Sequence, residues 1–282
     1  MAVATDILKQ FESELWRSSQ QTKSVMLYHA KKYLDFADGD DPFDRATVLR
    51  YLKHLEVEEK YAVNTVRVAG HVIHRLFQVA QVRFPLGKRW LPEVTDADKP
   101  VSTEDEIRQM IKAKLALDEL AFLALSTTYG LRREELKRIQ KEDIGYTNAT
   151  IFIRTCKHGD QRVHILAKEI APVLKKHNFT KEYTPNMLSQ IWHSIEQKSG
   201  VEHKYSAGWH SIRRYLDTIL LEKAGLENTA IFLRWQISRS SFMPLHYISK
   251  DTKQVDEEVF KVHPVLPLWQ ERLEDSIGRK VR

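Results

Sequence analysis

Residues 209–214 read WHSIRR and place a histidine and two arginines within five residues, with apolar residues interleaved. On a helix, His210 and Arg213 lie three positions apart and share a face. A purely structural helix seldom carries two potential cations side by side in this way. Taken alone, the stretch fits an ordinary basic helix end with a hydrogen-bonded histidine better than a functional site. Its meaning therefore depends on the segments before and after it.

The composition describes a folded protein that is long enough for two domains. The chain has 282 residues, of which 42% are apolar, and it contains only ten glycines. The excess of 44 Lys+Arg over 38 Asp+Glu gives a formal net charge of +6. A basic balance of this size favours a polyanionic partner such as nucleic acid, although many basic proteins have none.

Several classes of protein are excluded by the same composition. The single cysteine, Cys156, rules out an internal disulfide framework and fits the reducing cytoplasm. No apolar run approaches membrane-spanning length, and the amphipathic N-terminus is not a signal peptide. The twelve histidines are scattered, with no second cysteine and no HExxH motif. We therefore expect no membrane partner, no cofactor and no metal.

The first part of the chain, residues 1–98, is predicted to be a helical domain. Apolar residues recur at helical spacing from Val48 to Leu55, with Asp44 placed to cap the helix, and a longer stripe runs from Val66 to Ala80. The surface of that second helix carries basic residues, which fit either a solvated face or contact with the phosphate backbone of a duplex: Arg67, His71, His74 and Arg75.

A second domain is predicted over residues 99–282, after a linker at 91–102 that is rich in proline and acidic residues. Thr103 and Glu106 have capping-box spacing, and the apolar stretch LDELAFLALSTTYG predicts a buried helix that stops at Gly130. The runs ATIFIRTC and QRVHIL read as strands of a hairpin around the turn KHGD. The segments after residue 167 again look helical. The predicted fold is mainly α, with an α+β second domain built around a small antiparallel sheet.

Chemistry-bearing residues occur in four separate pieces of this second domain. Their types form a set suited to reaction at a phosphodiester. Two guanidiniums can bind the nonbridging oxygens of a phosphate, and an indole N–H can add a hydrogen bond. A tyrosine hydroxyl can serve as the nucleophile and a histidine can accept the proton of that hydroxyl. A lysine can donate a proton to the leaving alkoxide. In chain order the candidates are Arg132, Lys157, His210, Arg213, Trp235 and Tyr247.

Each candidate also has an ordinary structural interpretation. Arg133 is as basic as its neighbour, and His158 or Arg162 is easily mistaken for the turn lysine. Trp235 fits core packing as well as a phosphate contact. Tyr247 fits an amphipathic helix. The order of the whole set carries more weight than any member of it.

This order resembles that of the tyrosine recombinase (phage integrase) family, and the resemblance covers nearly the full chain. GLRREEL is similar to the family's first box, which implies the first catalytic arginine at Arg132 and a supporting glutamate at Glu135. CKHGDQRVHIL resembles the family's β-hairpin and implies a catalytic lysine at Lys157. HSIRR matches the second box, with His210 and Arg213.

The last box is represented by LRW and HYI. The resemblance places Trp235 where most members have histidine and some have tryptophan, and Tyr247 at the nucleophile's position. These two residues are twelve apart, a few more than the family usually shows. The second box continues with Arg214 and Tyr215 where histidine-threonine is commoner, which makes Arg214 a candidate for an added phosphate contact. The N-terminal helices resemble the family's core-binding domain.

The resemblance implies site-specific cutting and rejoining of double-stranded DNA without metal, nucleotide or other cofactor. It implies a 3′-phosphotyrosyl link, a two-domain clamp, and a tetramer that acts on two sites through a Holliday junction. It leaves accessory DNA-bending proteins open, and it implies a cytoplasmic location in a prokaryotic cell or a virus-infected host cell.

Two other interpretations remain at this stage. A type IB topoisomerase uses the same chemistry as a monomer, and a catalytically silent architectural protein shares the DNA-binding fold. The His-x-x-Arg spacing favours a recombinase over the first, and the intact set of candidates argues against the second.

The last segment, HPVLPLWQERLEDSIGRKVR, predicts a helix with one apolar face. Pro267 suits its first turn. The face carries Trp269, Leu273 and Ile277, and we expect it to dock on a neighbouring subunit.

Overall fold

The computed structural model describes residues 2–87, 90–93, 99–155, 161–204, 206–235 and 251–278, with the backbone alone given for 2–5 and 276–278. The chain separates into two compact units, Met1–Ala97 and Asp98–Arg282. The division falls inside the segment where the composition predicted a linker. Each unit has its own apolar core and is described by itself.

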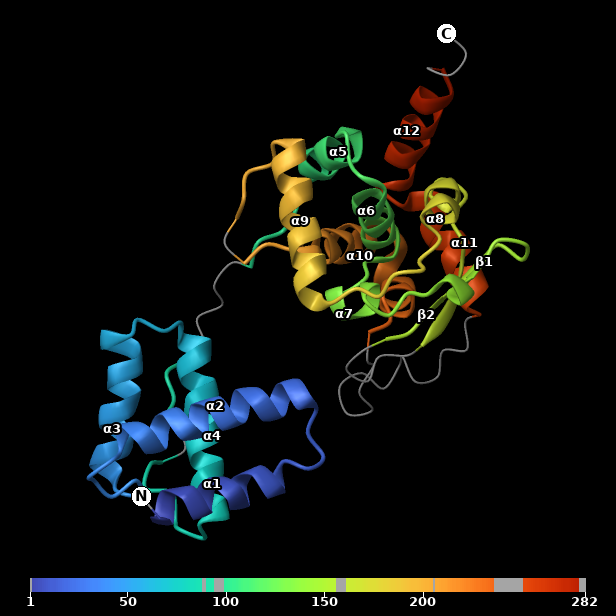
Figure 1. Cartoon of the computed structure of the whole chain (residues 1–282). Helices are drawn as coiled ribbons and strands as arrows, with labels where there is room; N and C mark the ends of the chain where they lie inside the picture. Colours follow the sequence, from blue (N-terminus) through green and yellow to red (C-terminus); the bar gives the residue numbers. More distant parts are fainter. Residues whose placement is uncertain are drawn as a thin grey trace. The chain divides into compact units, whose positions relative to one another are not determined.

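The first unit is entirely helical in its described residues (Figure 1). Asp44 caps the third helix as predicted, because its carboxylate accepts hydrogen bonds from the amides of Ala46 and Thr47. The helices are α1 (Ala2–Glu14), α2 (Gln20–Phe36), α3 (Arg45–Lys53), which continues as the π-helical turn η1 (His54–Glu58), and α4 (Val63–Val79).

The apolar stripe of α4 forms much of the core of this unit. Val66, Ala69, Ile73 and Phe77 are all fully buried, which confirms the period read from the sequence. The segment after the helix also packs here, since the ring of Trp90 lies against that of Phe84. Arg67 of this helix also donates to the carbonyl of Pro92, so the predicted linker is shorter than residues 91–102 on its N-terminal side.

The second unit is mainly helical, with a three-stranded antiparallel sheet of order β1-β2-β3 beside its helices (Figure 1). Thr103 and Glu106 form the predicted capping box. The elements are α5 (Glu104–Lys112), α6 (Leu117–Tyr129), α7 (Arg133–Leu136), η2 (Lys141–Asp143), β1 (Ile144–Gly145), β2 (Thr150–Ile153), β3 (Arg162–Ile165), α8 (Ala171–His177), α9 (Pro185–Ser199), α10 (Trp209–Phe232), α11 (Thr252–Val262) and α12 (Leu266–Gly278).

The central helices of this unit are α6 and α10, which pack against each other. Helix α6 is buried along almost its whole length, as its continuous apolar sequence predicted. Helix α10 bends at Gly225, whose φ of 80° departs from helical geometry. The hairpin prediction is confirmed by the register of β2 and β3, in which Ile153 pairs with Arg162.

The expectation that the last helix docks on a neighbour is wrong for its largest side chain. Trp269 of α12 is completely buried in the core of its own unit, and its indole N–H donates to Thr127 Oγ1 at 2.9 Å. Arg272 adds a hydrogen bond to the carbonyl of Ile111 at the end of α5. Sequence periodicity identified an apolar face but could not identify the surface that covers it.

Among the described residues, no helix combines the length and the apolar character that crossing a bilayer requires.

Candidate active site

The site is organised by the turn that links α6 to α7. Gly130 ends α6 with a φ of 60°, a left-handed conformation that favours glycine. A Cβ atom at this position would lie 2.7 Å from Leu233 Cδ2, so the close approach of the chain also requires glycine. The turn places Arg132 at the N-cap of α7, where the first box predicted a catalytic arginine.

Arg132 is held in place by Glu135, as the resemblance implied. Its backbone N–H donates to Glu135 Oε2 at 2.9 Å, and its Nη1 donates to Glu135 Oε1 at 2.8 Å. The side chain of Arg132 keeps 24% of its surface exposed, whereas that of Glu135 is fully buried. The hydrogen bonds to Glu135 therefore fix the guanidinium of Arg132, and its exposed surface remains accessible to a ligand.

Arg213 reaches the same place from α10. It is 4% exposed, and its Nη1 donates to the carbonyl of Gly130 at 2.8 Å while its Nη2 donates to that of Leu233. These bonds tie the end of α6 to the end of α10. Burial lowers the pKa of Arg213 to about 9, with Arg234 and Arg132 contributing in the same direction. It still carries its positive charge at neutral pH.

Glu135 is the buried negative charge among these arginines. Burial alone acts to raise its pKa, but the guanidinium of Arg234, the backbone amide of Arg132 and the charge of Arg213 outweigh that effect. The net result is a lowered pKa, so the carboxylate is charged. Three arginines around one carboxylate leave an excess of positive charge next to the exposed face of Arg132.

Arg234 was not predicted from the sequence. It lies directly after α10 at a φ of 55°, in a left-handed position that glycine usually occupies at a helix end. The amide of Trp235 donates to the carbonyl of Ala230 at 2.9 Å, which completes the helix-terminating motif. The side chain is completely buried. The only sequence signal was a charged residue within the apolar run AIFLRW.

The buried guanidinium of Arg234 joins segments that are far apart in the chain. Its Nη2 donates to the carbonyl of Tyr129 at 3.0 Å and approaches Glu135 Oε2 at 3.4 Å. Its Nη1 donates to the carbonyl of Phe232 at 2.9 Å and lies 3.3 Å from His164 Nε2. Arg234 and Arg132 therefore both contact the carboxylate of Glu135.

The network continues from the hairpin to the helix that follows residue 250. His164 of β3 is buried, and its Nδ1 lies 2.8 Å from Asp256 Oδ1 on α11. The second carboxylate oxygen of Asp256 accepts from the amide of Ile165 at 2.6 Å. Burial lowers the pKa of His164 despite this carboxylate, which favours the neutral ring. Helix α11 is thus fixed to the sheet by a buried polar pair.

His210 lies on α10, the helix that carries Arg213, and Trp235 follows the end of that helix. His210 is exposed on the first turn of α10, three residues before Arg213. Trp235 is half-buried against the core of the unit and hydrogen bonds to Asp217 of α10. Burial raises the pKa of Asp217, while Arg213 and Trp235 oppose the shift.

Two predicted residues, Lys157 and Tyr247, lie outside the described residues, so their roles stay predictions.

Three of the four residues predicted to contact DNA instead donate hydrogen bonds to backbone carbonyls of their own unit. These pairs are Arg67 with Pro92, Arg75 with Glu14 and Arg214 with Pro100. The fourth, His71, is exposed on α4.

Comparison with known proteins first defines the class of fold. The structure resembles a fragment of lambda integrase bound to DNA, with a TM-score of 0.64 and 13% identity, over 90% of this chain and 95% of that chain. It also resembles XerH site-specific recombinase bound to palindromic difH substrate, with a TM-score of 0.61 and 13% identity, over 98% and 84% of the two chains. The fold is that of the tyrosine recombinases.

Sequence similarity then extends this result. The chain is 22% identical over 260 residues to tyrosine recombinase XerA of Pyrococcus horikoshii, covering 82% of this chain and 90% of the relative. It is 24% identical over 253 residues to tyrosine recombinase XerA of Thermococcus kodakarensis, covering 82% and 86%. No family model matches the chain. In sequence and in fold the chain is therefore similar to tyrosine recombinases over most of its length, as the order of its motifs predicted.

Proposed function

We propose that this protein is a site-specific DNA recombinase that cleaves and rejoins double-stranded DNA through a covalent link to Tyr247. The observation that carries this proposal is the convergence of Arg132 and Arg213 around the buried carboxylate of Glu135. Two guanidiniums supported in this way suit the nonbridging oxygens of one phosphate, whose charge increases in the transition state. The relatives in sequence are named as tyrosine recombinases, which supports the same reaction.

The two arginines contribute in different ways. Arg132 is partly exposed and binds the scissile phosphate directly. Arg213 is almost fully buried and uses two of its five donors on carbonyls of the protein, which leaves the remaining donors for the phosphate. The excess positive charge also favours the ionised form of a tyrosine hydroxyl that enters the site.

The reaction follows from these charges and from the candidate side chains. The oxygen of Tyr247 attacks phosphorus and gives its proton to His210, while the bond from phosphorus to the 5′ oxygen breaks. Lys157 donates a proton to that oxygen, which leaves as a hydroxyl group. Trp235 turns its single indole N–H from Asp217 to the phosphate when DNA is bound. A 5′ hydroxyl then reverses the reaction, and no nucleotide is needed because the phosphotyrosyl ester retains the phosphodiester energy.

The assembly that we propose uses both units. Residues 1–98 act as a core-binding domain and residues 99–282 as the catalytic domain, so that the two clamp one DNA site. Four such chains join two sites and exchange strands through a Holliday junction, in the cytoplasm and with room for accessory DNA-bending proteins. Structures with this fold have been determined as a dimer on a core site and as a post-cleavage complex.

The proposal is tested with nicked suicide duplexes taken from the DNA that flanks the gene. We expect a protein–DNA adduct that survives denaturation, and we expect the Arg132→Ala variant to form it about 10²–10³-fold more slowly. The Arg133→Ala variant is the matched control, because it removes an equal charge from a neighbouring side chain that bonds to Ser189.

Three results would contradict the proposal. The first is the absence of an adduct on every flanking duplex, which leaves only DNA binding. The second is an equal loss of cleavage in the Arg132 and Arg133 variants. The third is relaxation of supercoiled plasmids that lack any such site, which indicates a topoisomerase.

A further inference from the structure

Three potential metal ligands gather at the C-terminal end of α9. They are His193 and Glu196 on the helix and His203 in the segment that follows it. Their ligand atoms all lie within 4.8 Å of one another. His193 Nδ1 is 3.2 Å from Glu196 Oε2, and His203 Nδ1 is 2.9 Å from the same oxygen.

The sequence spacing of these residues did not reveal the cluster. His193 and Glu196 lie three apart and share a helix face, which is a common arrangement for two ligands. His203 is brought back to them because Gly200 ends α9 with a φ of 70° and reverses the chain. The third ligand therefore depends on a turn and not on a motif.

The distances suit a small divalent cation. Zinc binds imidazole nitrogen and carboxylate oxygen at about 2.0–2.2 Å, so neighbouring ligands of a tetrahedral site lie about 3.3 Å apart. The two distances to Glu196 Oε2 reach that value after shifts of a few tenths of an ångström. The two imidazole rings lie nearly edge to face with their centroids 5.2 Å apart, and their ligand nitrogens lie within 4.8 Å of each other.

The burial of the three groups points the same way. The side chain of Glu196 is 6% exposed, whereas those of His193 and His203 are 59% and 53% exposed. A buried carboxylate is costly unless its charge is matched, and both rings already hydrogen bond to this one. A divalent cation matches it fully. Each exposed ring offers Nδ1 as a ligand whenever that nitrogen carries no proton.

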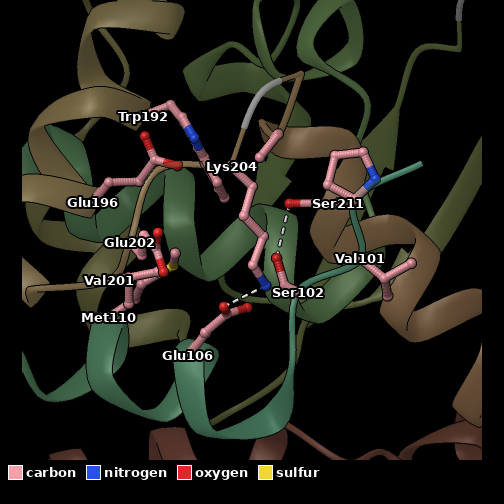
Figure 2. Close-up of a pocket in the computed structure, with 12 residues that line it drawn as sticks. Val101, Ser102, Glu106, Met110, Trp192, Glu196, Val201, Glu202, Lys204 and Ser211 are labelled. Atoms are coloured by element: carbon pink, nitrogen blue, oxygen red, sulfur yellow. Dashed lines mark hydrogen bonds and ion pairs between the residues drawn. The ribbon is translucent and has the colours of Figure 1, made fainter. Parts of the chain in front are cut away.

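The position of the cluster indicates what a bound ion would do. The segment from Glu202 to Gly208 leads directly into α10, which carries His210 and Arg213. Figure 2 shows the small pocket beside Glu196, where Lys204 of this segment pairs with Glu106 and where Ser211 of α10 hydrogen bonds to Ser102. An ion on His203 would fix the start of this segment to α9.

The geometry points to a structural zinc site formed by His193, Glu196 and His203, with water as the fourth ligand, which fastens the segment before α10 to α9. The site does not depend on the proposed recombination, because its three ligands are none of the residues assigned to DNA chemistry. Its test needs no DNA, so failure of the site and failure of the proposed function are distinguishable.

The test uses the full chain without a histidine tag, stripped with a chelator and titrated with zinc chloride. We expect one equivalent of zinc to bind and to raise the melting temperature. Substitution His193→Ala or His203→Ala should weaken binding by at least about tenfold, the loss that even outer-shell changes produce. Cobalt in place of zinc should show the intense visible absorption of a tetrahedral site, and the same two variants should abolish it.

The matched control is His71→Ala, which removes an exposed histidine from the other unit and should leave zinc affinity unchanged. Because each histidine also hydrogen bonds to the buried Glu196, the melting temperature of every variant is first measured without metal, and the rise caused by zinc is compared with that baseline. Hydrogen exchange at the amides of Glu202–Lys204 should slow on addition of zinc.

Three outcomes would overturn the inference. The first is no stoichiometric binding, and the second is an equal loss of binding in the His71 and His203 variants. In either case the histidines serve only as hydrogen-bond partners of Glu196. Stoichiometric binding without slower exchange in the segment would overturn the fastening role.

Discussion

Arg234 adopts a backbone conformation that is unfavourable for arginine, and its side chain makes contacts with residues far away in the chain. A non-glycine residue in the left-handed region costs about 1–2 kcal/mol. The guanidinium offsets this cost by hydrogen bonds to the carbonyls of Tyr129 and Phe232 and by its charge next to Glu135. Glycine would adopt this backbone conformation at lower cost, but only the arginine side chain makes the contacts to Tyr129, Phe232 and Glu135.

We predict that Arg234→Gly separates these two roles. Glycine accepts the left-handed conformation, so the helix end should persist, but Glu135 loses one of its supports and Arg132 loses its fixed orientation. Adduct formation should fall about 10²-fold, as for loss of one positioned donor, while DNA affinity stays within about twofold. Single-turnover cleavage and gel-shift assays measure the two quantities. Unchanged cleavage would mean that Arg234 serves packing alone.

A second prediction at this scale concerns Lys157. The variant Lys157→Ala should slow cleavage of an ordinary phosphodiester but largely spare a substrate with a sulfur atom at the 5′ bridging position. Sulfur is the better leaving group and needs less help from a general acid. Parallel cleavage rates on the two substrates provide the measurement. If both rates fall equally, Lys157 binds DNA and does not donate the proton.

At the residue scale, sequence reasoning found the residues that belong to motifs and missed those defined by contact. Arg132, Glu135 and Arg213 were predicted from the order of their boxes, and the structure brings them together. Arg234 was missed because its partners come from distant parts of the chain. The pairing of His164 with Asp256 was missed for the same reason, since 92 residues separate them.

Helix α12 illustrates the same limit at the scale of elements. Its apolar period was predicted, yet the partner of its apolar face was not. Trp269 enters the core beneath α6, and His263 just before the helix bonds to the carbonyl of Thr128. The C-terminal segment therefore hydrogen bonds to two consecutive threonines of α6, and these bonds hold the segment on its own unit.

We predict that Trp269→Ala destabilises the catalytic unit by about 3–5 kcal/mol, the usual cost of truncating a buried aromatic side chain. The loss of its hydrogen bond to Thr127 adds to this cost. Thermal melting should show the change, and truncation after residue 262 should lower the melting temperature further. The substitution Trp16→Ala is the control, because that side chain is 72% exposed. A stable Trp269 variant that fails only to assemble on two sites would restore the role in a neighbouring subunit.

Long, strongly periodic elements were predictable, and short or irregular ones were not. The stripe of α4, the buried α6 and the two hairpin strands all follow from local pattern. Strand β1 has only two residues and therefore no period to detect. The bend of α10 at Gly225 also escaped prediction, because an isolated glycine within a helix does not specify a bend.

At the scale of the whole molecule, the chain consists of two units with separate cores and a net positive charge. A protein that surrounds a duplex neutralises many phosphates and releases their counterions. We predict that affinity for a duplex site falls by about 10³–10⁵ between 50 and 200 mM salt, as expected for six to ten phosphate contacts. Titrations over this range of salt provide the measurement.

The two units separated near residues 98–102 should each bind DNA less tightly than the whole chain. Linkage raises the effective concentration of the second unit once the first is bound. Both fragments contain their own apolar cores, so each can be tested by gel shift at low salt after a check of its melting behaviour. If residues 1–98 do not contact DNA under these conditions, the core-binding role of this unit is wrong.

The proposed function rests above all on a covalent bond between Tyr247 and DNA. The most direct measurement compares the wild type with Tyr247→Phe on a nicked suicide duplex, followed by mass spectrometry of the peptide that carries the DNA. We predict a wild-type adduct on the peptide that contains Tyr247. The variant should bind the duplex with nearly unchanged affinity but form no adduct, because only one hydroxyl is lost. An adduct that persists in Tyr247→Phe, or that maps to another tyrosine, would contradict it.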